Sequence, residues 1–261
     1  MKAFLKNILL KNSITLGKYS KNQKKLVNEF LAKIKIIDAN YELIRIGCNN
    51  DGGYLIPNIL DEIEFCFSPG VGNKSYFEDH LSNFNIKSFL ADGTVDYIGK
   101  HDFTKKNLNS FNDINNTTLE SWVHQKIEDK SNDKLLLQMD IEGSEIEVLY
   151  TASPSLLNRF KCIIIEFHHF HKIVDDLGLK IYSDIFNKIL KNHYIVHIHP
   201  NNESKVLNIN KNNIPNLLEI TFVNKKNVKN VKKINYSLPH QLDQKCAPSL
   251  KEIKCPEIFY K

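Results

Sequence analysis

Residues 135–143 read Leu135-Leu136-Leu137-Gln138-Met139-Asp140-Ile141-Glu142-Gly143, an apolar run that ends in acidic residues and a glycine. A nearly continuous apolar run of this kind is typical of a parallel strand that is covered on both faces. The next residues, 144–150, have the spacing of a helix. A buried strand that delivers carboxylates into a turn and a helix indicates the ligand-binding edge of an α/β sheet.

Segments of the same two kinds alternate along much of the chain. We predict strands at 63–68, 87–91, 135–139, 162–167, 194–198 and 219–223, and helices at 76–84, 144–150 and 181–191. This alternation predicts a doubly wound, mostly parallel α/β sheet. Ligands of such sheets bind outside the carboxyl ends of the strands, so the strand ends carry the functional prediction.

Composition excludes several other classes of protein. The 261 residues are 42% hydrophobic and 25% charged, which is ordinary for a soluble globular protein. The net charge of +5 is mild and its lysines are scattered, so we expect no nucleic-acid partner. The 5 cysteines have no paired short spacing, which favours reduced thiols in a cytoplasmic protein. No apolar run approaches the roughly 20 residues of a transmembrane segment, and the pattern does not indicate an oligomeric state.

The N-terminal region differs from the rest of the chain. Residues 1–10 predict a short helix rather than a signal peptide, because Lys6 interrupts the apolar run and no cleavage site follows. Residues 22–37 have apolar positions at helical spacing, which predicts an amphipathic docking helix. We therefore divide the chain into an N-terminal helical appendage, 1–42, and a main α/β domain with a C-terminal tail, 43–261.

The first two strand ends have features of a nucleoside site. The first strand runs into Pro69-Gly70-Val71-Gly72-Asn73, a glycine turn that lets the backbone approach a cofactor, although a plain turn is the alternative. This turn lacks the third glycine of the dinucleotide fingerprint. The second strand ends at Asp92, about 20 residues later, where a carboxylate can accept hydrogen bonds from ribose hydroxyls. The alternative there is an Asp-Gly turn.

Acids and histidines follow the next strands. Asp140 ends one strand, and Glu166 and His168 end its neighbour, so their oxygen and nitrogen atoms would converge in a shared crevice suited to a divalent cation such as Mg, Mn or Fe. A structural alternative is that Asp140 caps the following helix. Glu142 and Glu145 are expected to brace the turn and helix. His199 or Asn201, after a later strand, completes the site or belongs to a turn.

At these residues the chain resembles the FkbM family of class I methyltransferases, a group associated with O-methylation of sugars and related natural products. The matching stretches lie between residues 43 and 223, at 45–47, 51–54, 69–73, 77–78, 92, 118–119, 139–145 and 165–168. The segment 238–243 resembles a tail of sugar-methylating relatives. The resemblance implies a Rossmann-like, seven-stranded methyltransferase sheet with an antiparallel last strand and a final hairpin made by 194–198 and 219–223.

The resemblance also implies which residues hold the cofactor. S-adenosylmethionine would lie across Gly70, Gly72 and Asn73, with its ribose held by Asp92. Residues of one further segment would fold over the cofactor or the substrate, namely Arg45, Asp51, Gly52 and Gly53. Many relatives have Glu-Pro where this chain has Asp92-Gly93, but the shorter acid keeps the carboxylate.

The expected reaction is methyl transfer from S-adenosylmethionine to a hydroxyl of a small-molecule sugar or nucleotide-sugar, or of a capsule or lipopolysaccharide sugar. A metal held by Asp140, Glu166 and His168 would lower the pKa of the attacking hydroxyl. His169 or His199 would accept its proton, and His168 would be the base if no metal is used. The alternatives are a nucleotide-sugar enzyme of another reaction class and a non-catalytic sugar- or nucleotide-binding protein on the same fold.

Overall fold

The main sheet of the protein has seven strands and is mostly parallel. The computed structural model describes residues 21–209 and 212–261. The strands of the main sheet, in spatial order, are β10 (His193–Pro200), β13 (Leu218–Asn224), β9 (Phe160–Phe167), β8 (Leu135–Met139), β3 (Phe65–Pro69), β4 (Lys87–Ala91) and β5 (Asp102–Thr104). Only β13 runs antiparallel to its neighbours. The predicted mostly parallel α/β sheet is confirmed, and the predicted final hairpin corresponds to β10 and β13.

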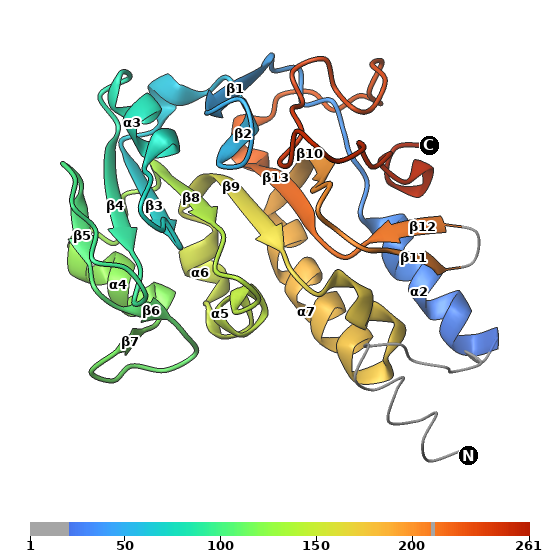
Figure 1. The fold of residues 1–261 in the computed structure, drawn as a ribbon, viewed down its shortest axis with the longest axis horizontal. Helices are drawn as coiled ribbons and strands as arrows, with labels where there is room; N and C mark the ends of the chain where they lie inside the picture. Colours follow the sequence, from blue (N-terminus) through green and yellow to red (C-terminus); the bar gives the residue numbers. More distant parts are fainter. Residues whose placement is uncertain (1–20, 210–211) are drawn as a thin grey trace.

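Helices cover one face of this sheet, whereas the other face is shared between a helix and a hairpin (Figure 1). Among the described residues, the α-helices are α2 (Lys21–Lys33), α3 (Tyr76–Ser82), α4 (Leu119–Lys126), α5 (Glu145–Thr151), α6 (Pro154–Leu157) and α7 (Asp176–Asn192). Short 3-10 turns are η1 (Leu60–Glu62), η2 (Phe170–Val174), η3 (Lys225–Asn227) and η4 (Glu257–Phe259). Residues of α2, α4, α5, α6 and α7 bury one face, and α3 with the β1–β2 hairpin buries the other.

The described part of the chain also forms three small sheets of two strands each. They are β1 (Leu43–Gly47) with β2 (Gly53–Pro57), β6 (Asn107–Leu108) with β7 (Asn116–Thr117), and β11 (Val206–Ile209) with β12 (Asn212–Pro215). The β1–β2 hairpin lies against β9, β10 and β13. It therefore covers the face of the sheet on which the candidate site lies.

The strand β8 shows why its sequence is almost wholly apolar. Leu135 and Leu137 belong to the core under the helices, whereas Leu136 belongs to the core under α3 and the hairpin. Because successive side chains of a strand point to opposite faces, Gln138 and Asp140 fall on the hairpin side with Leu136. The polar residues of this segment are thus all directed to one face.

The helix α2 docks on the helical side of the sheet. Its Phe30 ring lies 5.4 Å from the ring of Phe186 in an edge-to-face contact, which is a favourable aromatic geometry. The docking helix predicted for 22–37 is found, but it ends at Lys33, and Ile36 forms a β-bridge with Ile195. The helix predicted at 1–10 lies outside the described residues, and the domain boundary after residue 42 stays a prediction.

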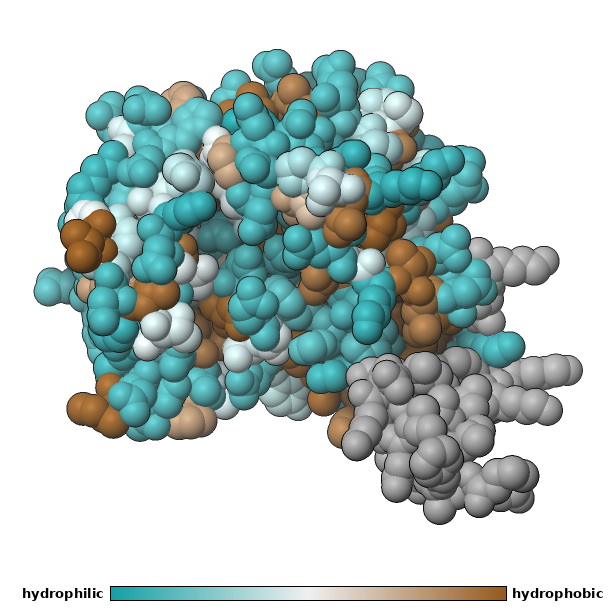
Figure 2. Space-filling view, viewed as in Figure 1, coloured by the Kyte–Doolittle hydropathy of each residue, from teal (hydrophilic) through white to brown (hydrophobic). Residues whose placement is uncertain are grey.

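The surface of the protein is mixed. On the face drawn in Figure 2 hydrophilic side chains dominate, and hydrophobic ones occur in small separate groups. Within the part of the chain that the structure describes, no helix combines the length and the apolar character needed to cross a membrane.

Candidate active site

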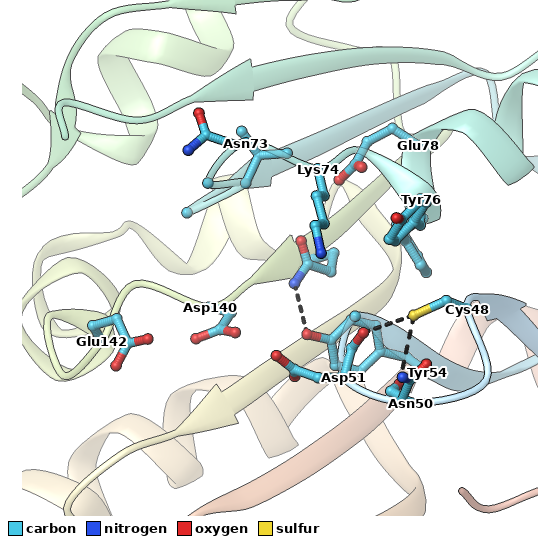
Figure 3. A pocket seen from close by; sticks show the side chains of 16 residues that line it. Cys48, Asn50, Asp51, Tyr54, Asn73, Lys74, Tyr76, Glu78, Asp140 and Glu142 are labelled. Carbon is cyan, nitrogen blue, oxygen red and sulfur yellow. Dashed lines mark hydrogen bonds between the residues drawn. The ribbon is translucent and has the colours of Figure 1, made fainter. Parts of the chain in front are cut away.

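Two adjoining cavities run along the carboxyl ends of β3, β4 and β8. The first, of about 640 Å³, lies between the turn of the β1–β2 hairpin and the glycine turn after β3 (Figure 3). The second, of about 360 Å³, extends past Asp92 at the end of β4. Both are lined by Gly70, Gly72, Asp140 and Glu142. One continuous crevice therefore lies where ligands of α/β sheets bind.

The glycine turn forms the wall between the ends of β3 and β8. Gly70 has φ +85°, and a Cβ at this position would lie 1.5 Å from the carbonyl oxygen of Asp140. Gly72 has φ +58°, but a Cβ there would meet nothing within 4 Å. Gly70 is thus required by close backbone contact, whereas Gly72 and the neighbouring Asn73 line the cavity.

Asp92 connects the end of β4 to the glycine turn. Its Oδ2 accepts a hydrogen bond from the backbone N–H of Gly72 at 3.1 Å, and its Oδ1 accepts one from the backbone N–H of Thr94 at 2.7 Å. The side chain lines the second cavity. Its Oδ1 also accepts a hydrogen bond from the Thr94 hydroxyl at 2.6 Å, whereas Oδ2 has a further lone pair, so Asp92 can also accept a hydrogen bond from a ligand.

A buried chain of polar side chains forms the floor of the first cavity. Gln138 Nε2 donates to the Tyr54 hydroxyl at 3.3 Å, and Ser68 Oγ lies 2.6 Å from Gln138 Oε1. Ser68 Oγ also contacts Glu78, and burial raises the pKa of Glu78 to about 7. Because a hydroxyl has a single proton, a protonated Glu78 that donates to Ser68 satisfies both contacts of Ser68.

Asp140 lies at the border of the two cavities. Burial raises the pKa of this carboxyl group to about 7. Its Oδ1 is fully buried and accepts no hydrogen bond from the described residues. That oxygen lies 4.0 Å from Nε2 of His168, and Oε2 of Glu142 lies 3.4 Å from the same nitrogen. The donor atoms of Asp140, Glu142 and His168 lie within 4.8 Å of one another, so this group can hold a divalent cation.

The other nitrogen of His168 is held from behind. Its Nδ1 lies 3.1 Å from Oε1 of the fully buried Glu145. Burial disfavours the imidazolium form, but the hydrogen bond and charge of Glu145 outweigh this effect and raise the pKa of His168. Glu145 thus braces the turn and helix as expected. Glu142 instead lines both cavities.

Glu166, the third predicted ligand, lies outside this three-donor group. It is 3% exposed, and its Oε1 accepts a hydrogen bond from Asn201 Nδ2 at 2.8 Å. Burial, together with the negative charge of Asp140, raises the pKa of Glu166. Asn201, which the sequence suggested as an addition to the site, therefore contacts Glu166.

The two histidines predicted as proton acceptors lie in different surroundings. His169 is exposed and packs close to Gly143, because a Cβ on Gly143 would lie only 3.0 Å from Nε2 of His169. His199 is buried, with Nδ1 2.9 Å from Oε2 of Glu219. Neither His169 nor His199 lines either of the two cavities.

The segment predicted to fold over the ligand forms one wall of the first cavity. Asp51 and Gly52 line it, and Figure 3 shows Asp51 on the side opposite Lys74. Arg45 does not line it. Its Nε donates to the carbonyl of Cys48 at 2.8 Å, so it fixes the turn. A Cβ on Gly53 would lie 2.0 Å from the same carbonyl, so Gly53 serves the tight turn.

Several polar residues of the cavity were missed from the sequence. They are Tyr54, Lys74, Glu78 and Gln138. Glu142 also lines the cavity, although from the sequence we expected it only to brace the turn and helix. Gln138 carried a usable signal, because an amide inside an otherwise apolar strand needs a hydrogen-bond partner. Lys74 carried none, since lysine is common on exposed turns.

Together these features define an α/β protein with a polar ligand crevice at its strand ends, next to buried carboxylates and a histidine. A family model described as Methyltransferase FkbM domain matches residues 17–196. The protein belongs to the FkbM methyltransferase family, as the sequence motifs predicted. A search among curated proteins gave no match.

Proposed function

We propose that the protein transfers a methyl group from S-adenosylmethionine to a hydroxyl of a sugar, either nucleotide-activated or part of a surface polysaccharide such as capsule or lipopolysaccharide. Membership of the FkbM family supports methyl transfer. The observation that carries the proposal is the position of Asp140. Its buried Oδ1, which has no hydrogen-bond partner among the described residues, lies at the border between a nucleoside-sized and a larger cavity.

The second cavity fits the adenosine part of the cofactor. Asp92 would accept hydrogen bonds from the ribose, and Gly72 leaves open space beside it. Gly70 and Asn73 would complete the wall along the rest of the molecule. S-adenosylmethionine supplies an electrophilic methyl group on a sulfonium, and the carboxylates at the border would favour that positive charge.

The first cavity fits a hydroxyl-rich acceptor. Carboxylates of Asp51, Asp140 and Glu142 line it and accept hydrogen bonds from hydroxyls. Lys74 lines the opposite side, where its ammonium group would favour the phosphate of a nucleotide-sugar. Holding a hydroxyl about 3 Å from the methyl carbon would supply much of the rate.

The acceptor hydroxyl needs help because it is a weak nucleophile. A divalent ion, Mg, Mn or Fe, held by Asp140, His168 and Glu142 would supply Lewis acidity there. Glu166 would support Asp140 from the neighbouring strand.

His169 is our preferred proton acceptor over His199. Partial burial and the neighbouring Lys172 lower its pKa, so its imidazole is neutral at pH 7.

The decisive experiment screens nucleotide-activated sugars with labelled S-adenosylmethionine, with and without added divalent metal. We expect label in a sugar product, with turnover lost in Asp140→Asn. Glu147→Gln, on an exposed position of α5, is the matched control and should retain turnover. Full turnover by Asp140→Asn would contradict this active site.

Two further measurements separate the alternatives. Calorimetry should detect binding of S-adenosylmethionine and none of NAD, since binding of NAD would favour a different reaction class. Exhaustive chelation should reduce turnover. Unchanged activity after chelation would show that the metal has no catalytic role, and His168 would then be the candidate base.

A further inference from the structure

A second cluster of metal-binding side chains lies under the C-terminal tail. It consists of His199 on β10, Glu219 on β13 and Cys246 in the tail, which are 3%, 7% and 8% exposed. The Nδ1 of His199 lies 2.9 Å from Oε2 of Glu219, and the thiol of Cys246 lies 3.1 Å from Oε1 of the same carboxylate. The donor atoms of the three residues lie within 4.8 Å of one another.

The register of the strands brings two of the three residues, His199 and Glu219, together. His199 pairs with Glu219 across β10 and β13, and Glu219 pairs with Glu166 across β13 and β9. Paired residues point to the same face, so these side chains form one row beneath the tail. Carboxylates that face each other repel, which makes a cation at the outer end of the row favourable.

The tail brings the thiol to the row. Asn202 fixes the residue after Cys246 through two hydrogen bonds of 2.8 Å, one from its Nδ2 to the carbonyl of Ala247 and one to its Oδ1 from the N–H of Ala247. On the other side of Cys246, Oδ1 of Asp243 lies 2.8 Å from Nε2 of His197, which is two residues before His199 on β10. Cys246 is therefore held in place by contacts on both sides of it.

We propose that His199, Glu219 and Cys246 bind a zinc ion that fastens the tail to the sheet. Imidazole, thiolate and carboxylate are the donors that zinc takes, and a bidentate Glu219 would complete a shell of four. Zinc bonds of about 2.0–2.3 Å set the donors of different residues roughly 3.3–3.7 Å apart. Nδ1 of His199 and the thiol of Cys246, which lie 2.9 and 3.1 Å from the Glu219 oxygens, would therefore move away from that carboxylate by about half an ångström, while its two oxygens keep their fixed spacing.

The far side of His199 has the partner that a zinc-bound histidine needs. Its Nε2 lies 3.3 Å from Oε1 of Glu252, yet both atoms are buried and neither makes a hydrogen bond with the described residues. Zinc on Nδ1 would fix the proton on Nε2 and direct it toward Glu252, the usual carboxylate–histidine–metal arrangement. Binding releases the thiol proton of Cys246 and the second imidazole proton.

The test is the metal content of tag-free protein purified from zinc-supplemented cells. We expect about one zinc per chain in the wild type, and its loss in Cys246→Ser and in His199→Gln. Cys255→Ser is the matched control, because Cys255 is a buried tail cysteine outside the cluster. His168→Ala tests the other metal group and should keep the zinc.

A spectroscopic measurement on the wild type needs no variant to fold. Cobalt exchanged into the protein should give a thiolate-to-cobalt charge-transfer band, and zinc should raise the midpoint of thermal unfolding of chelator-treated protein. A wild type without zinc and without the cobalt band would overturn the proposal. So would zinc retained by Cys246→Ser, or zinc lost from His168→Ala. These outcomes do not depend on methyl transfer.

Discussion

Glu145 Oε1 lies 3.1 Å from Nδ1 of His168 and also accepts the backbone N–H groups of Ile141 and Gly143, each at 3.1 Å. One buried carboxylate therefore fixes both the turn after β8 and the imidazole beside Asp140. Because Nδ1 is engaged, Nε2 of His168 is the nitrogen that faces Asp140 and Glu142.

This relationship predicts that Glu145→Gln acts through His168. We expect metal affinity to fall about 10–100-fold, the usual cost of losing the carboxylate behind a metal-bound histidine. Turnover should fall with it, while the Kd for S-adenosylmethionine should change little because Glu145 lines neither cavity. Metal titrations and calorimetry measure both, with Glu147→Gln as the control. A variant that loses cofactor affinity but keeps its metal dependence would contradict this role.

Asp92 provides a prediction for the cofactor alone. Asp92→Ala should weaken binding of S-adenosylmethionine by roughly 10–100-fold, since a hydrogen bond to a charged group contributes about 1.5–3 kcal/mol. Asp96→Asn, a few residues further along, is the control, because that side chain is 94% exposed and pairs with Lys105. The measurement is calorimetry. Equal affinities in the two variants would place the ribose elsewhere.

Much of the fold could be predicted from apolar runs. The strands at 87–91 and 135–139 match β4 and β8 to the residue, because runs buried on both faces have sharp ends. The β1–β2 hairpin and the short β5 were not recognised as strands. Arg45 interrupts the alternation in β1, and β5 has only three residues, Asp102–Thr104, so neither contains a usable period.

The site was predictable only as far as strand order allowed. Residues at the ends of adjacent strands, such as Asp140 and His168, could be expected to meet. Which of these side chains contact one another could not be predicted, because the contacts depend on the register of the strands and on the position of the C-terminal tail. Glu166 faces Asn201 and Glu219, and His199 lies under the tail beside Cys246. Glu142 has positive φ, 56°, which turns its side chain toward His168, and no spacing rule foresees such a turn.

The contact between Gly70 and Asp140 predicts a large difference between two glycine substitutions. A Cβ at Gly70 would lie 1.5 Å from the Asp140 carbonyl, so Gly70→Ala must separate β3 from the end of β8. Gly72→Ala meets no atom within 4 Å and bears only the cost of its positive φ, about 1–2 kcal/mol. Urea unfolding should show a clearly larger loss for Gly70→Ala. Equal losses would contradict the close approach of the two turns.

The buried Glu78 predicts a pH dependence of stability. Burial raises the pKa of its carboxyl group from 4.5 to about 7, so the folded protein holds the proton more tightly than the unfolded chain does. The contribution to stability is complete below pH 4.5 and decreases as the pH rises to about 7, by at most about 1.4 kcal/mol per pH unit.

Glu78→Gln tests this directly, because an amide imitates the protonated acid and can still donate to Ser68. We expect the free energy of unfolding of the ligand-free wild type to fall, relative to Glu78→Gln, as the pH rises between 4.5 and 7, and the difference to level off above 7. Chemical denaturation at a series of pH values measures it. The exposed control Glu147→Gln should follow the wild type throughout. Parallel curves for Glu78→Gln and the wild type would mean that Glu78 is ionised in the folded protein. The Ser68 hydroxyl would then donate its hydrogen bond to Glu78, and not to Gln138.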